Sequence, residues 1–126
     1  MVSVSAEHGM VTNALPQIAQ TFLREWTRLR TQPGADPQAR LAPDLLTIEL
    51  HDALTARERT LAQTEAGRDL VTRVVDHWID AVYPRLAGQI ESLLDCYITS
   101  TGIELEPNEG CVRVQIGLRR APLLVM

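Results

Sequence analysis

One long amphipathic helix constrains what this chain can fold into. From Glu65 to about Asp95, apolar residues recur at three- and four-residue steps, the spacing of one helix face. The stripe consists of Leu70, Val71, Val74, Val75, Trp78, Ile79, Val82, Leu86, Ile90, Leu93 and Leu94. Two consecutive apolar residues at most turns make this stripe wider than one packing partner requires. We therefore expect the helix to contact a sheet and also another helix or a second subunit. Pro84 lies inside it, and its missing N–H predicts a kink or a break.

Two helix starts come just before this stripe. Thr55-Ala56-Arg57-Glu58 is a capping box, in which the threonine oxygen accepts from a backbone N–H and the glutamate accepts from the threonine N–H. This pattern predicts a short helix to about Gln63. Thr64 can cap the long helix that follows, and Gly67 lies in the first turn of that helix.

A further amphipathic helix is predicted from a cap at Asn13 to about Gln32. Its apolar stripe consists of Leu15, Ile18, Ala19, Phe22, Trp26 and Leu29. Residues 1–11, which precede it, are short and mixed, and we expect them to be flexible. Residues 33–43 hold three prolines and a glycine, a composition typical of a connector.

Alternating apolar residues predict the strands. Residues 46–50 alternate with period two, and so do residues 111–118. Residues 97–101 form a β-branched and aromatic run, which can extend through Gly102 to Leu105. The turn cluster Glu106–Gly110 separates it from 111–118, and this order predicts a β-hairpin. The fold class is therefore α+β, in the order α-β-α-α-β-β. We expect a small, mainly antiparallel three-stranded sheet with helices packed on one face.

Composition excludes several classes of function. The chain has 126 residues, one domain's length, and its 16 acidic against 12 basic residues leave a net charge of −4. That balance disfavours a nucleic-acid partner. All of the basic residues are arginines, which excludes a lysine Schiff base or a phosphate-loop lysine. Without a signal peptide or a run of roughly 20 apolar residues, we expect a cytoplasmic protein that does not insert into the membrane.

The polar residues do not form an obvious catalytic or metal-binding constellation in the sequence. Asp76 and Asp80 share a helix face beside His77, but no second cluster with ligand spacing is present. Cys96 and Cys111 lie far apart and make no paired-ligand spacing. We therefore expect no catalytic site, no metal and no cofactor. An arginine-paired, solvated helix face accounts for the aspartates.

The end of the chain predicts an interface. Residues 119–126 form an apolar tail in which Leu123, Leu124 and Val125 need cover. The tail can dock on the chain's own core or on another subunit. Together with Trp78 on the wide stripe, it favours a homo-oligomer, most simply a two-fold dimer.

Two joined motifs resemble the central signature of the MpsC family. Its members read L-T-x-x-E-x-x-L, then T-E-x-G-R-x-L-V, then a helix with an internal proline. The matching residues are Leu54, Thr55, Glu58 and Leu61, then Thr64, Glu65, Gly67, Arg68, Leu70 and Val71, then Pro84, Leu86, Ile90 and Glu91. The resemblance covers residues 12–118, a single domain. It departs at Thr99-Ser100-Thr101-Gly102, where members often have a Ser-Asp pair.

This resemblance implies a small cytoplasmic protein linked to a membrane system for cation and inorganic-carbon uptake, with no catalytic mechanism supplied. Our leading hypothesis is a non-enzymatic accessory or regulatory protein that contacts a transporter subunit and acts as a homo-oligomer. The alternative is a small-molecule or anion sensor at the two helix starts. Its candidate ligand-binding residues are Thr55, Glu58, Thr64 and Arg68. These residues also have a purely structural interpretation, as helix caps and local ion pairs.

Overall fold

The computed structural model describes residues 2–30 and 34–120. Four antiparallel strands form one sheet: β1 (Ala35–Ala42), β2 (Leu45–His51), β3 (Cys96–Glu106) and β4 (Cys111–Arg120). Their order across the sheet is β1-β2-β4-β3, so β2 and β4 are the central strands. The α+β class, the antiparallel pairing and the β3–β4 hairpin are confirmed. The expected number of three strands was wrong.

The additional strand is β1, which occupies the segment that we expected to be a connector. It pairs with β2 in an antiparallel ladder that ends with Ala42 opposite Leu45. Pro37 is tolerated for two reasons: β1 is an edge strand, and the register shifts between Ala35 and Gln38. The proline content pointed to a connector because proline cannot join a central strand, and the edge position removes that restriction.

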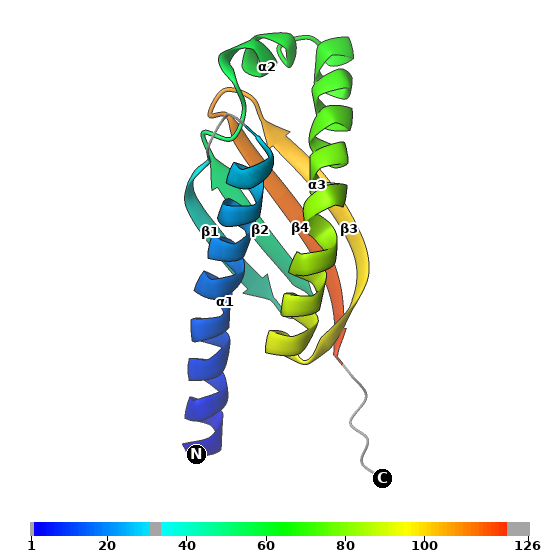
Figure 1. Cartoon of the computed structure of the whole chain (residues 1–126). Helices are drawn as coiled ribbons and strands as arrows, with labels where there is room; N and C mark the ends of the chain where they lie inside the picture. The colour runs from blue at the N-terminus through cyan, green and yellow to red at the C-terminus, as the bar shows by residue number, and fades with distance from the viewer. Residues whose placement is uncertain (1, 31–33, 121–126) are drawn as a thin grey trace.

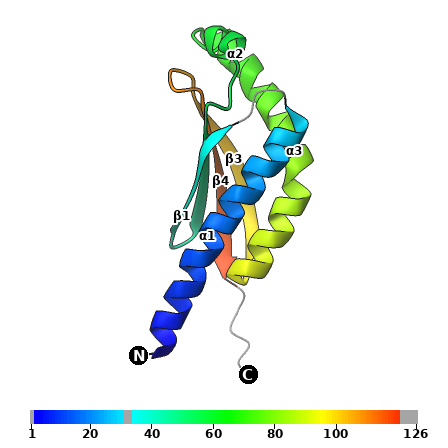
Figure 2. The ribbon, with the colours of Figure 1, turned by 60° about the vertical axis from the view of Figure 1, so that its left-hand side comes forward.

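Two long helices lie on one face of the sheet, as Figures 1 and 2 show. They are α1 (Val2–Leu29) and α3 (Glu65–Leu94), with the short α2 (Ala56–Leu61) just before α3. The start predicted for α1 at Asn13 was wrong, because the helix begins at Val2. Apolar periodicity identifies the buried face of a helix and does not by itself fix the residue at which the helix begins. The flexibility of residues 1–11 and the domain bounds stay predictions.

The core lies between the helices and the sheet. α3 contributes the buried residues Val71, Val75, Ile79, Val82, Leu86 and Ile90, and α1 contributes Ile18, Phe22 and Trp26. They pack against alternate residues of the central strands, namely Leu46, Ile48 and Leu50 of β2 and Val112, Val114 and Ile116 of β4. As predicted, α3 contacts both a helix and the sheet, since it packs on α1 and on β3.

Pro84 does not break α3, which continues from Glu65 to Leu94 with the proline inside it. The predicted break was therefore wrong, and the predicted kink stays a prediction. The neighbouring Val82 and Leu86 are both buried in the core. Their packing supplies stability that offsets the hydrogen bond lost at the proline.

The two predicted helix starts are confirmed. Thr55 Oγ1 accepts from the Glu58 N–H at 3.1 Å, and a Glu58 carboxylate oxygen accepts from the Thr55 N–H at 2.9 Å. Thr64 Oγ1 accepts from the Gly67 N–H at 3.0 Å. A Cβ atom on Gly67 would lie 1.8 Å from the carbonyl oxygen of Leu61. Glycine is therefore required where α2 passes into α3, because any side chain would collide with the α2 backbone.

Two glycines of α3, Gly67 and Gly88, differ in whether a side chain would fit at their position. We expect Gly67→Ala to lower the free energy of unfolding by roughly 1–3 kcal/mol, since the methyl group would force the two helices apart. Gly88 is the matched control, because a Cβ there meets nothing within 4 Å. Gly88→Ala should raise stability by roughly 0.5–1 kcal/mol through helix propensity. Urea denaturation measures both, and equal effects of the two substitutions would contradict the packing account.

Candidate functional site

The second face of the sheet is not covered by helices and carries polar side chains. Along β2, Leu46, Ile48 and Leu50 belong to the core. Successive residues of a strand point to opposite faces, so Thr47, Glu49 and His51 lie on the open face. Figure 2 shows the long helices α1 and α3 on the other face of the sheet. Polar groups of this face must therefore be satisfied by one another or by solvent.

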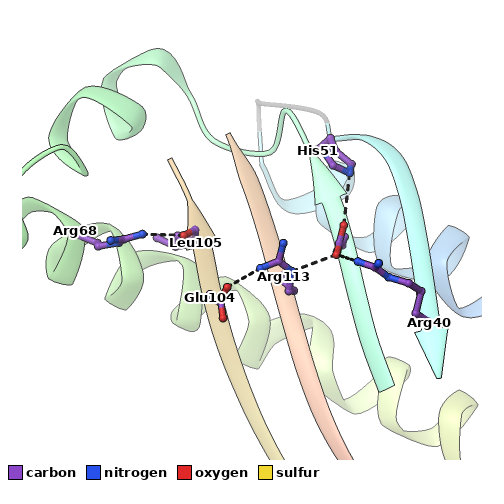
Figure 3. A network of polar contacts seen from close by, with 7 residues as sticks. Arg40, His51, Arg68, Glu104, Leu105 and Arg113 are labelled. Atoms are coloured by element: carbon purple, nitrogen blue, oxygen red, sulfur yellow. Dashed lines mark hydrogen bonds and ion pairs between the residues drawn. The ribbon is translucent and has the colours of Figure 1, made fainter. Parts of the chain in front are cut away.

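Four charged residues form a ladder across all four strands of this face (Figure 3). The charge ladder runs Arg40 of β1, Glu49 of β2, Arg113 of β4 and Glu104 of β3, with alternating sign. Arg113 is the register partner of both Glu49 and Glu104. Its Nε donates to Glu49 Oε1 at 3.2 Å, and its Nη1 donates to Glu104 Oε1 at 2.5 Å. Arg40 also donates to Glu49 Oε1.

Glu49 is the centre of this ladder and is only 5% exposed. Burial alone would raise the pKa of its carboxyl group. The hydrogen bonds and positive charges of Arg113 and Arg40 outweigh burial and hold the pKa below its ordinary value of 4.5. The same contact with Glu49 raises the pKa of Arg113, against the effect of its own burial. The carboxylate is therefore charged at neutral pH although it is buried.

A histidine and a cysteine lie beside the second carboxylate oxygen of Glu49. His51 Nε2 is 3.7 Å from Glu49 Oε2. Leu50 pairs with Val112, so the antiparallel register brings His51 next to Cys111. The donor atoms of Glu49, His51 and Cys111 all lie within 4.8 Å of one another. These three residues are called the open-face triad below.

Cys111 is buried, at 1% exposure. Burial raises the pKa of its thiol, and the negative charge of Glu49 raises it further. The group is therefore a protonated thiol at neutral pH and a poor nucleophile. Cys96, the other cysteine, is also buried, and burial and then Glu91 and Asp95 raise its thiol pKa.

An open cavity adjoins the triad at His51. It has a volume of about 720 Å³ and is lined by Asp36, Pro37, Gln38, His51, Asp52 and Glu109. Asp36 and Asp52 both have positive φ, of 49° and 51°. Three carboxylates and one imidazole therefore line this cavity, and the carboxylates give the lining a negative charge.

The residues that we predicted as a ligand site bond mainly within the protein. Thr55 and Thr64 accept from backbone N–H groups of the helices they cap. Arg68 Nη2 donates to the carbonyl oxygen of Leu105 on β3 at 3.0 Å (Figure 3). None of Thr55, Glu58, Thr64 and Arg68 lines the cavity beside His51. These contacts support the structural interpretation of the signature over the sensor.

The arginine partner of Glu58 is Arg30, at the end of α1. The two side chains form an ion pair in which Arg30 is 7% and Glu58 16% exposed. The guanidinium of Arg30 also lies 4.9 Å from the ring centroid of Trp26. The capping box thus ties α1 to the start of α2, a long-range contact that the local motif does not predict.

The other residues that the sequence analysis named lie in different parts of the structure. Asp76 and Asp80 share one helix face as predicted, and both line a cavity of about 220 Å³ against Thr101 and Gly102 of β3. Trp78 is partly buried and packs against the core. The predicted interface residues Leu123, Leu124 and Val125 lie outside the described residues.

The open-face triad is the part of the site that the sequence did not reveal. His51 directly follows the alternating run 46–50, and Cys111 begins the run 111–118, but the sequence does not show that these two strands are paired. The proximity of His51 and Cys111 depends on the register of two strands that are separated along the chain by α2, α3 and β3. The available signal was the period-two pattern, which places Glu49 and His51 on the same face of β2.

Comparison with known families identifies one match. The MpsC family model, described as "Na+-translocating membrane potential-generating system (MpsC)", matches residues 9–118. No curated protein and no solved structure matches the chain. The matched range contains both helix starts, the charge ladder and the open-face triad.

Glu49 makes the stability of the fold depend on pH. Its pKa is lowered in the folded protein, so between that value and 4.5 the unfolded chain binds more protons. The charged Glu49 carboxylate contributes its full stabilisation above pH 4.5, the ordinary pKa. This stabilisation is lost as the pH falls through the lower pKa that Glu49 has in the folded protein. We expect Glu49→Gln to lower the free energy of unfolding by roughly 1–3 kcal/mol at neutral pH. The same change should flatten the fall in stability under acid.

Urea denaturation from neutral pH down to about pH 3 measures this effect. Arg40→Met keeps the carboxylate and removes one of the two guanidiniums that bind it. Its free energy of unfolding should fall under acid less steeply than that of the wild type and more steeply than that of Glu49→Gln. Parallel stability curves for the wild type and Glu49→Gln would show that Glu49 has an ordinary pKa in the folded chain.

Proposed function

The chain belongs to the MpsC family, and on that premise we propose that it is a non-enzymatic accessory or regulatory component of a membrane system for cation and inorganic-carbon uptake. We propose that it works in the cytoplasm through protein contacts and as a homo-oligomer. The observation that carries this proposal is the family match over residues 9–118, because the family is described as a Na⁺-translocating, membrane potential-generating system.

Two structural observations support a role that depends on contacts. Within the described residues, neither α1 nor α3 contains an apolar stretch that is long enough to cross a bilayer. A link to a membrane system is therefore proposed to run through a protein partner.

The two cysteine thiols both have raised pKa values, and the helix-start hydroxyls already accept backbone hydrogen bonds. These groups are poorly prepared for nucleophilic catalysis.

An apolar ridge on α3 is the surface that we propose for self-association. Leu70 and Val74 are 53% and 39% exposed and lie one helical turn apart, and partly buried Trp78 continues their line. This α3 ridge consists of Leu70, Val74 and Trp78. The exposed Asp69 and Arg73 lie beside it with opposite charges. Such an arrangement suits a second copy, because a two-fold axis can place the Asp69 of one copy opposite the Arg73 of the other.

Affinity capture from native membranes tests this proposal. A tagged chain, produced together with an untagged copy, should recover both the untagged copy and cation-transport subunits of the membrane, as identified by mass spectrometry. We expect Leu70→Asp to reduce recovery of the untagged copy at least about tenfold, because it places a charge in the apolar ridge. Leu41→Asp is the matched control, since Leu41 is an exposed leucine on the edge strand β1.

Each part of the proposal can fail separately. Absence of every membrane transport subunit from the wild-type capture would contradict the accessory role. Equal recovery of the untagged copy by wild type and Leu70→Asp would contradict the assignment of self-association to the α3 ridge.

A further inference from the structure

The open-face triad combines three donor types at one point of the sheet. Glu49 offers a carboxylate oxygen, His51 an imidazole nitrogen and Cys111 a sulfur, and these atoms lie within 4.8 Å of one another. Glu49 and His51 are two residues apart on β2, and Cys111 lies on the neighbouring β4. Three donors on one face of two paired strands are therefore close enough to bind one ion together.

The spacing suits a small metal ion. Zinc binds nitrogen and oxygen ligands at about 2.0–2.2 Å and sulfur at about 2.3 Å, in a tetrahedron. Two ligands at such bond lengths lie roughly 3.4–3.6 Å apart. His51 Nε2 and Glu49 Oε2 are already 3.7 Å apart. The Cys111 sulfur lies within 4.8 Å of both atoms, so side-chain rotation has to close only the remaining distance of roughly 1 Å.

The remaining contacts of Glu49 leave the required oxygen available. Both guanidiniums, of Arg40 and Arg113, bind Oε1, while Oε2 faces His51. A carboxylate that binds a metal through one oxygen is commonly held by hydrogen bonds at the other. Arg40 and Arg113 would thus orient the ligand, and Glu104 binds Arg113 from the far side and partly balances its charge.

The burial of Cys111 distinguishes it from Cys96. Both thiols are buried, but Cys96 belongs to the hydrophobic core cluster, whereas Cys111 is not among the described members of that cluster. Cys111 lies instead on the polar face beside a carboxylate and an imidazole. A neutral thiol is stabilised mainly by apolar packing, which these polar neighbours do not provide. A metal-bound thiolate at the same position would be stabilised by the positive charge of the ion.

We propose that Glu49, His51 and Cys111 bind a zinc-like divalent transition-metal ion, with a fourth coordination position facing the cavity beside His51. A mixed oxygen, nitrogen and sulfur donor set selects such ions over magnesium or calcium, which prefer oxygen ligands alone. This inference replaces the sequence expectation of no metal, and it does not rest on the proposed function. Bound metal would join β2 to β4 and release the Cys111 thiol proton.

Cobalt titration of the full chain, purified without a polyhistidine tag, tests the proposal. Co²⁺ bound by a thiolate gives a sulfur-to-metal charge-transfer band in the near ultraviolet, and tetrahedral coordination gives intense visible bands. We expect one equivalent to bind, with a dissociation constant on the order of 1 μM or tighter, and Zn²⁺ to displace it. Mg²⁺ should not displace it.

Matched variants assign the bands to the triad. Cys111→Ser should abolish the charge-transfer band, whereas Cys96→Ser should keep it, since Cys96 is a buried thiol outside the triad. His51→Gln changes a side chain that is only partly buried, and it should weaken binding at least about tenfold while the chain stays folded. Thermal unfolding without metal reports whether each variant folds.

Zinc should also raise the melting temperature of the wild type with increasing concentration, and should do so far less in His51→Gln. A titration without a charge-transfer band would overturn the proposal. So would a band that survives in a folded Cys111→Ser chain, or equal affinity of wild type and His51→Gln.

Discussion

Glu49 keeps its negative charge at a position that is 5% exposed because Arg40 and Arg113 both bind its Oε1 atom. The two long helices cover only one face of the sheet, so polar residues on the other face must compensate one another. The charge ladder meets this requirement across four strands. With Oε1 bound by both guanidiniums, the second oxygen of Glu49 faces His51, and the register of β2 against β4 places Cys111 beside them in the open-face triad.

Features encoded by neighbouring residues could be predicted from the sequence. The capping box of Thr55 and Glu58, the second cap at Thr64 and the β3–β4 hairpin all depend on spacing within a few residues. The need for glycine at position 67 was also foreseeable, because two helix starts so close together leave little room for a side chain. Local chemistry was sufficient for each of these features.

Features that depend on distant contacts could not be predicted in the same way. The composition of the β1 segment predicts a connector, because the effect of Pro37 depends on whether its strand lies at an edge, and only the complete sheet decides that. The partner of Glu58 is Arg30, just after the end of α1, rather than a residue of the signature. The open-face triad depends on the register of β2 against β4, and register is set by the whole core.

A double-mutant cycle between Glu49 and Arg113 tests most directly whether this carboxylate and guanidinium hold the open face together. Glu49→Gln, Arg113→Met and the double variant would be unfolded in urea at neutral pH. If the two groups stabilise each other as described, the effects are non-additive, with a coupling free energy of at least about 1 kcal/mol. Additive effects, within about 0.3–0.5 kcal/mol, would show that the pair contributes nothing as a unit and would contradict the role of the charge ladder.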